Sequence, residues 1–325
     1  MHARALLSAA LSVALALAAA TAAAQAPWPS KPIRVVIPLP AGGIVDIVGR
    51  AVTEKVSAAL GQPLVVENRP GANSNIGIEA VHKATPDGYT WMIAGPAVLS
   101  NPAIYPDLPW QPERDFTATG LIVWTQNIAV VPASLPVHSL REFAAYAKAR
   151  PGQLHFANPG SGASNHLQTE LFRHVAGIDL IGVGYKGQPP AIPDLINAQI
   201  AFMVPSVGLV QQHIASGRLR ALATFTHQRL KSMPELPTVA EAGYPEAVVV
   251  PWFGAYVSSR VPRDITQKVN AAISAALRAP DVIERLEKSG SLPGPAMSLA
   301  ELEKSVRSDM AQYAKVVKVA GIKPE

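Results

Sequence analysis

The sequence predicts an α/β protein built from two domains, and three observations lead to this fold class. From residue 33 onward, short runs rich in aliphatic and β-branched residues alternate with amphipathic helical stretches, which is typical of βα units. A second series of such units begins near Leu121. The chain of 325 residues is also longer than one ordinary hydrophobic core supports. Two α/β units in tandem are therefore expected.

The first series predicts strands at residues 33–37, 64–67 and 90–94. Apolar residues recur at helical spacing over 44–59, and a second helix is expected over 73–84. Strands joined by helices in this way imply a parallel sheet that helices cover on both faces.

The second series predicts strands at 128–131, 154–157, 180–183, 200–204 and 221–224, with helices over 139–149 and 163–175. From about Phe253 the chain offers one strand and then three helices. Such a tail cannot form a sheet layer of its own, so it is expected to pack back onto the first unit. Domain one then comprises residues 25–123 and 251–325, domain two comprises 124–250, and the two crossings of the chain form a hinge.

The N-terminus has the pattern of a secretory signal peptide, which we expect to occupy residues 1–24. Arg4 supplies a positive charge, residues 5–20 are apolar, and three alanines end the segment at Ala24. The alternative is a permanent membrane anchor, since the apolar run approaches the length of a spanning helix. Cleavage near Ala24 predicts a free periplasmic protein. The chain has no cysteine, so neither a lipid-attachment residue nor a disulfide is expected.

The charge of the chain gives only a weak indication of its partner. The net charge is +5, and loss of Arg4 with the leader lowers it to about +4. This modest excess favours anionic solutes, and there is no cluster of basic and aromatic residues typical of nucleic-acid binding. We expect no nucleic-acid partner.

Two loops join a predicted strand to a predicted helix through glycines. The first glycine loop is residues 38–43 and leads into a helix that carries Asp46. The second such stretch runs from Asn158 to His166 and adds the hydroxyls of Ser161 and Ser164; its first six residues, 158–163, are called the second glycine loop. Each helix start offers main-chain N–H groups and a partial positive charge to an anion. If the domains face each other, both loops meet in one cleft and hold a carboxylate between them. A structural turn remains the alternative for each loop alone, as does a capping role for Asp46 and a packing role for His166.

Enzymatic interpretations find less support in the same residues. No phosphate-binding motif occurs in the first glycine loop, and neither Ser161 nor Ser164 lies in the Gly-x-Ser-x-Gly pattern of serine hydrolases. The histidines lack the His-Glu-x-x-His spacing of zinc enzymes. We therefore expect no catalytic residue, metal or cofactor. A secreted hydrolase that uses Ser161 or Ser164 with His166 is the rival from another class.

A series of ordered motifs makes the chain resemble the Bug-type receptors of tripartite tricarboxylate transporters. The motifs begin with Trp28-Pro29-Ser30-Lys31-Pro32-Ile33 and residues 38–46. They continue with Val66-Glu67-Asn68-Arg69-Pro70-Gly71-Ala72, Pro86-Asp87-Gly88-Tyr89-Thr90, Asn101-Pro102-Ala103-Ile104-Tyr105, residues 160–167, Tyr185-Lys186-Gly187, residues 217–223, residues 237–243 and Trp252-Phe253-Gly254. The resemblance extends from Trp28 to the C-terminus.

The resemblance implies a type II periplasmic-binding-protein fold, also called a Venus flytrap, that binds a carboxylate between its lobes. Such receptors deliver their ligand to one large and one small integral membrane protein, while some members serve a sensor kinase instead. The protein is expected to be a monomer. The resemblance adds two further segments to the site, residues 95–97 and 205–206, which we call its two corners. The expected ligand-binding residues are then Ala41, Gly42, Gly43, Asp46, Gly95, Pro96, Ala97, Ser161, Gly162, Ala163, Ser164, His166, Pro205 and Ser206.

Three departures from the family pattern concern the ligand. The family's Gly-Gly-Gly-Thr-Asp is here Gly42-Gly43-Ile44-Val45-Asp46, and Gly95-Pro96-Ala97 replaces a Gly with Thr or Ser. Val204-Pro205-Ser206 stands where many members carry an Asp. The pocket is thus expected to be more apolar and to lack a partner for an ammonium group, which predicts a partly apolar carboxylate without an amine.

Overall fold

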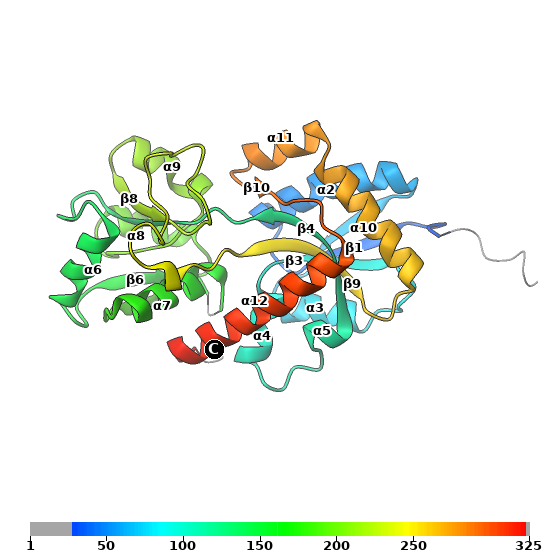
Figure 1. Ribbon diagram of the computed structural model, residues 1–325, viewed down its shortest axis with the longest axis horizontal. Coiled ribbons are helices and arrows are strands. Elements are labelled where there is room, and N and C mark those ends of the chain that lie inside the picture. Colours follow the sequence, from blue (N-terminus) through cyan, green and yellow to red (C-terminus); the bar gives the residue numbers. More distant parts are fainter. Residues whose placement is uncertain (1–27, 161, 323–325) are drawn as a thin grey trace, which may run out of the picture.

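The protein forms two α/β lobes joined by extended segments (Figure 1), and the computed structural model describes residues 28–160 and 162–322. The expected signal peptide and the Ser161 side of the second glycine loop lie outside these described residues. Within them, no helix has the length and apolar character needed to span a membrane.

The first lobe is built on a six-stranded sheet in the order β10-β4-β9-β3-β1-β2. Its strands are β1 (Ile33–Ile37), β2 (Leu64–Asn68), β3 (Thr90–Ala94), β4 (Phe116–Trp124), β9 (Trp252–Ser258) and β10 (Leu292–Pro293). Strand β1 runs parallel to β2 and β3, while β9 is antiparallel to both β3 and β4. The expectation of a wholly parallel sheet was wrong, because β4 leaves this lobe and β9 returns to it in the opposite direction.

Helices cover both faces of this sheet, as the sequence predicts. They are α2 (Ile44–Leu60), α3 (Asn75–His82), α4 (Ala97–Ile104), α5 (Pro112–Asp115), α10 (Arg263–Leu277), α11 (Pro280–Lys288) and α12 (Leu299–Ala320). Side chains alternate along β1: Val35 packs into one core with α2 and α10, while Val36 packs into another with α3 and α12. This alternation places the sheet between two helical layers.

The second lobe contains two small sheets. Strands β5 (Ile128–Pro132) and β8 (Leu219–Thr224) pair antiparallel, and β6 (His155–Asn158) and β7 (Ile181–Gly184) pair parallel. The expected strand at 200–204 forms only single bridges, from Phe202 to Phe156 and from Met203 to Val130, so it links the two sheets without becoming a regular strand. The helical elements are α6 (Leu140–Lys148), α7 (Ser164–Ala176), η1 (Pro189–Ala191), α8 (Ile192–Ile196), α9 (Val207–Ala215) and η2 (Pro245–Ala247).

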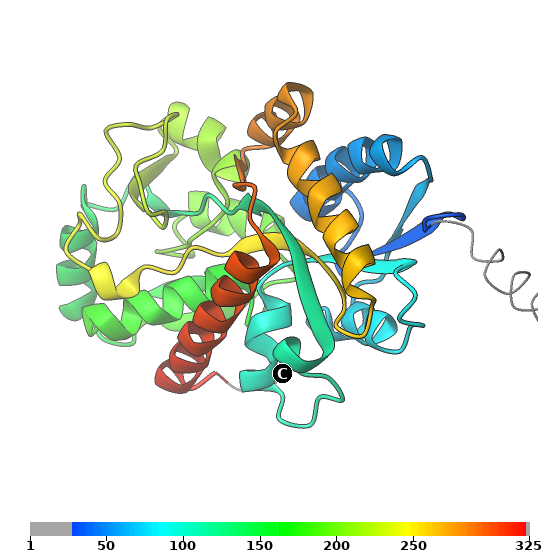
Figure 2. The same cartoon turned by 45° about the vertical axis from the view of Figure 1, so that its right-hand side comes forward.

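The chain passes between the lobes next to Thr125 and Pro251, where the two crossing segments lie side by side. The backbone N–H of Thr125 donates to the carbonyl oxygen of Pro251 at 2.8 Å, and its hydroxyl donates to the same oxygen at 3.0 Å. Helix α12 makes a third connection, because it packs against β4 and α4 of the first lobe and α7 of the second. Figures 1 and 2 show this helix, in red, running across the junction of the two lobes.

Candidate binding site

Strands β1, β2 and β3 end at one edge of the first lobe's sheet, and each end leads into the start of a helix. Because the three strands are parallel and in register, the loops that follow Ile37, Asn68 and Ala94 lie next to each other. Strand β1 lies between the other two, so the first glycine loop starts between the loops that precede α3 and α4. This edge is where open α/β sheets bind ligands.

The first glycine loop exposes main-chain donors. Residues 41–43 are exposed, and Gly42 adopts a φ of +77°, which favours glycine. The first bond of α2 runs from the N–H of Ile47 to the carbonyl oxygen of Gly43 at 3.0 Å. The N–H groups of Ile44, Val45 and Asp46 have no acceptor among the described residues. The start of α2 can therefore receive an anion.

Asp46 holds this loop from within the protein. Its buried carboxylate accepts hydrogen bonds from the N–H of Gly42 at 3.0 Å, from Arg50 Nε at 2.9 Å and from Asn68 Nδ2 at 3.1 Å. Burial alone would raise the pKa of Asp46, but the hydrogen bonds from Arg50, Gly42 and Asn68 and the charge of Arg50 outweigh it, so the pKa is lowered. The carboxylate is ionised and already paired at neutral pH.

The second glycine loop also leads into a helix start with free N–H groups, but Gly162 is buried and Ala163 and Ser164 are half-buried. Gly160 and Gly162 have φ values of +141° and +76°, and Ala163 is the N-cap. The first bond of α7 runs from the N–H of Leu167 to the carbonyl oxygen of Ala163 at 2.9 Å. In the described part of the chain, no acceptor meets the N–H groups of residues 164–166. The start of α7 on the second lobe can therefore receive an anion as well.

His166 is buried beneath the second glycine loop. Its Nδ1 accepts a hydrogen bond from the N–H of Gly162 at 3.2 Å, and its Nε2 lies 3.5 Å from a carboxylate oxygen of Glu170. Both nitrogens therefore face internal partners. No hydrogen bond joins Ser164 to His166, although both lie in the described part of the chain, so this pair lacks the contact of a serine hydrolase.

The corner formed by Gly95, Pro96 and Ala97 has a different character. A Cβ on Gly95 would lie 2.2 Å from Cε1 of Phe253, so the glycine permits the aromatic ring to pack directly on the backbone. The N–H groups of residues 98–100 donate to the carbonyl oxygens of Gly95 and Pro96. This corner therefore contributes apolar surface and few free donors.

Pro205 and Ser206 lie at the start of α9, and Pro205 is buried. Gln188 engages Ser206 twice: its Oε1 accepts the N–H of Ser206 at 2.9 Å, and its Nε2 lies 3.3 Å from the hydroxyl. The N–H of Val207 donates to the carbonyl oxygen of Gln126 at 2.9 Å. The polar groups of this corner are largely satisfied within the lobe.

The second glycine loop touches the first lobe. A Cβ on Gly162 would lie 2.4 Å from Cδ1 of Ile104 and 3.1 Å from Nδ2 of Asn73. The first glycine loop makes no such approach, since no described atom lies within 4 Å of a Cβ placed on Gly42. The structure thus places the second glycine loop against the turn that precedes α3 and the last residue of α4, whereas nothing packs against Gly42 of the first glycine loop.

An asparagine network at this edge was missed by the sequence reasoning. Asn101, which is fully buried, donates to the carbonyl oxygen of Asn73 and to Oδ1 of Asn75, both at 2.8 Å, and accepts from Nδ2 of Asn73 at 2.8 Å. The network holds residues 72–74, which all have positive φ values. Three polar residues directly after the turn at Gly71 were the available signal.

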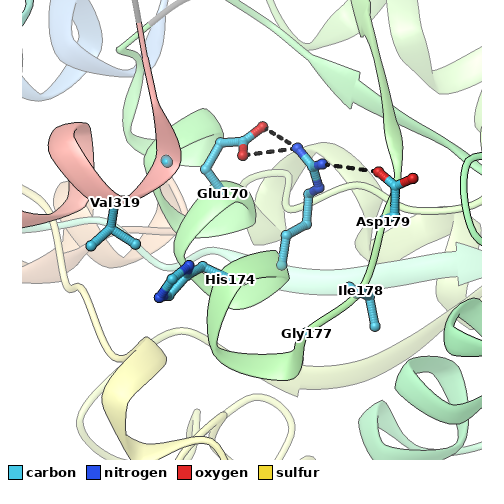
Figure 3. A pocket seen from close by; sticks show the side chains of 8 residues that line it. Glu170, His174, Gly177, Ile178, Asp179 and Val319 are labelled. Atoms are coloured by element: carbon cyan, nitrogen blue, oxygen red, sulfur yellow. Dashed lines mark hydrogen bonds and ion pairs between the residues drawn. The ribbon is translucent and has the colours of Figure 1, made fainter.

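None of the expected site residues lines either of two hollows of the described surface. One, of about 430 Å³, lies beside the C-terminal ends of α7 and α12 and is lined in part by Arg173 and by Glu170 and Asp179, with both of which Arg173 pairs (Figure 3). The other, of about 540 Å³, lies between η1, α8 and α9 and is mostly apolar. Among the described residues, no three His, Asp or Glu side chains gather as a metal site.

Comparison with known proteins places this architecture in a family. The model of the family described as "Tripartite tricarboxylate transporter family receptor" matches residues 48–322. Protein BugT of Bordetella pertussis is 33% identical over 298 residues, which cover 91% of each chain.

Solved structures agree with this match. R. palustris Rpa4515 with adipate has a TM-score of 0.81 and 31% identity, over 92% of this chain and 100% of its own. MatC of Rhodopseudomonas palustris with bound malate has a TM-score of 0.76 and 29% identity, over 89% of this chain and 100% of its own. The protein therefore has the two-lobed fold of periplasmic binding proteins, and the chain belongs to the tripartite tricarboxylate transporter receptor family, the Bug-type solute-binding receptors.

Proposed function

We propose that this protein is a periplasmic receptor that holds a small carboxylate between its lobes and delivers it to a membrane transporter of one large and one small subunit. The lobes in this proposal comprise residues 25–123 with 251–325, and residues 124–250. The leader is removed near Ala24 and the receptor acts as a monomer. A sensor kinase remains the alternative partner, since it uses the same binding chemistry.

The observation that carries the proposal is the pair of open helix starts, one on each lobe. The first turns of α2 and α7 both present N–H groups without acceptors among the described residues, as an anion site requires. Each helix dipole contributes only about 0.3–2 kcal/mol, so affinity depends on several hydrogen bonds made together. The adipate and malate named in the related structures are carboxylates, the class of ligand proposed for this site.

The remaining expected residues complete the proposed pocket. Residues 41–43 and 162–164 let the carboxylate come close to the free N–H groups of residues 44–46 and 164–166, and the hydroxyls of Ser161 and Ser164 are proposed as further hydrogen-bonding groups. The corners at residues 95–97 and 205–206 line the rest of the ligand. Because Gly95 packs against the ring of Phe253, we propose that the corner at residues 95–97 faces an apolar part of the ligand.

A thermal-shift screen against a carboxylic-acid library tests the function, because a ligand that binds only the folded state raises its melting temperature. Calorimetry on Gly43→Leu then tests the site. Gly43 has an extended backbone conformation that any residue adopts, and a Cβ there would meet only the carbonyl oxygen of Pro40 at 3.4 Å. The fold is thus expected to tolerate the change while the leucine blocks the ligand.

The matched control is Ala58→Leu, which adds similar bulk to an exposed position on the same helix. We expect at least about tenfold weaker binding in Gly43→Leu and unchanged binding in the control, and likewise a loss in Ser164→Ala of about 0.5–3 kcal/mol. Unchanged affinity in both Gly43→Leu and Ser164→Ala would rule out the proposed site.

A further inference from the structure

His166 connects the second glycine loop to a chain of charged side chains along α7. The N–H of Gly162 can only donate, so Nδ1 of His166 must be the acceptor in their 3.2 Å contact. The imidazole proton therefore resides on Nε2, which lies 3.5 Å from Oε1 of Glu170. The geometry thus selects a single tautomer of this histidine.

Glu170 is itself fixed by its neighbours. Arg173 donates to both of its carboxylate oxygens, at 2.7 and 2.8 Å, and also lies 3.7 Å from Asp179 (Figure 3). Burial would raise the pKa of Glu170, but the hydrogen bond from His166 and the charge of Arg173 outweigh it, so the pKa lies below its usual value. Glu170 is therefore an ionised carboxylate at neutral pH and can accept a hydrogen bond from the Nε2–H of His166.

One face of the imidazole lies toward an aromatic ring. The ring of Phe156 in β6 lies nearly parallel to that of His166, with centroids 6.4 Å apart and planes 11° apart. The guanidinium of Arg173 lies 5.1 Å from the centroid of the same phenyl ring. The buried imidazole thus has partners at both nitrogens and an aromatic ring beside it, which favours one orientation of the ring.

We propose that His166 is a positioning residue that sets the second glycine loop for ligand binding and does not itself touch the ligand. The effect on ligand binding rests on the proposed function. Gly160 and Gly162 have positive φ values, so the loop has little intrinsic stiffness. The bond to His166 fixes the N–H of Gly162, and with it the path of the backbone from Gly162 to the free N–H groups of residues 164–166. It also sets where Gly162 meets Ile104 of the other lobe.

Two variants of His166 distinguish the role of its hydrogen-bond acceptor from the role of its imidazole ring. In His166→Asn the amide oxygen takes nearly the place of Nδ1 and keeps an acceptor for Gly162, whereas His166→Leu has none. His174→Leu is the control, because His174 is exposed on the same helix. The measurements are the nitrogen NMR shifts of the imidazoles, amide hydrogen exchange at Gly162, and calorimetry with adipate as the probe.

We expect the wild-type His166 to show an unprotonated Nδ1 and a protonated Nε2. His166→Leu should raise the exchange rate of Gly162 and weaken adipate binding, each by about tenfold, while His166→Asn stays within about threefold of the wild type. Equal losses in both variants, or a protonated Nδ1 in the wild type, would overturn the proposal. Should the wild type bind no carboxylate, the proposed function fails, but the NMR shifts and Gly162 exchange still decide the role of His166.

Discussion

Gly162 of the second lobe packs directly against Ile104 of the first. A Cβ on this glycine would lie 2.4 Å from Cδ1 of Ile104, which is closer than real contacts of this kind. The backbone at Gly162 also has a positive φ, +76°, which is close to the +77° of Gly42. Glycine is therefore required at this position for two reasons: the turn has a positive φ, and the two lobes approach each other closely here.

Gly162→Ala should weaken ligand binding and lower stability. The positive φ alone costs an alanine on the order of 1 kcal/mol, and the methyl group must additionally displace Ile104. Melting temperature and carboxylate affinity measure the two effects.

The control is Gly177→Ala at the other end of α7. Gly177 has a φ of +60°, and its nearest neighbour to a Cβ is Cε of Lys148 at 4.0 Å. The control should lose stability for the same backbone reason and keep its affinity. If Gly177→Ala weakened binding as much as Gly162→Ala, contact with Ile104 could not be the cause.

Gln168→Leu should destabilise the protein at the junction of its lobes. The fully buried Gln168 accepts from Nδ2 of Asn127 at 2.8 Å and donates to the carbonyl oxygen of Val249 at 2.7 Å, so it joins both crossing segments to α7. Leucine keeps the bulk and leaves two buried groups unpaired, at about 1–3 kcal/mol each.

Urea unfolding measures this free energy, with Gln211→Leu on the exposed side of α9 as the control. A loss no larger than that of the control would show that the two hydrogen bonds contribute nothing net to the junction.

Asp309→Asn should make the protein more stable at pH 7. Asp309 accepts a hydrogen bond from Nε1 of Trp252 at 2.6 Å, and burial raises its pKa above 3.8 despite that bond and the charge of His227. The folded state thus binds the proton more tightly than the unfolded chain, so stability falls as pH rises from about 3.8 through the folded pKa.

Asparagine still accepts from Trp252 and carries no charge at any pH, so the gain over the wild type should be full at pH 7 and vanish below about pH 3.8. Asp107→Asn, at an exposed position, controls for the change in net charge. Denaturation curves at several pH values measure the difference. A gain that did not depend on pH would contradict the assignment to the carboxyl group.

The elements that follow from local pattern agree closely with the sequence. Strands β1 and β3 begin and end at the predicted residues, because four of the five residues of each are apolar and buried. The stretch at 200–204 has the same pattern and forms only single bridges, since its partners are set by long-range packing. The antiparallel direction of β9 could not be predicted from the local sequence either, because it depends on the path of the chain through the other lobe.

The candidate site divides in a similar way. The glycine loops and their helix starts follow from local motifs, whereas the use of each side chain depends on its neighbours. Asp46 is paired with Arg50 four residues on, and the spacing Gly162, His166, Glu170 also repeats every four residues. This i, i+4 spacing was a signal for internal pairing that could have been found in the sequence.

The preferred ligand should be a carboxylate without an ammonium group and with a sizeable apolar part. A buried ammonium group needs an ionised partner. Asp46, the acidic residue that follows the first glycine loop, already pairs with Arg50, Asn68 and Gly42. Ser206 offers a hydroxyl engaged by Gln188 where an acid would be needed. Burial of ligand carbon against the apolar corner at residues 95–97 contributes roughly 25 cal/mol per Å². Calorimetric titration with adipate, benzoate-type acids, citrate, aspartate and glutamate checks this preference. Adipate or an aromatic acid should bind at least about tenfold more tightly than either amino acid, and tightest binding of aspartate or glutamate would show that the pocket contains an acidic partner after all.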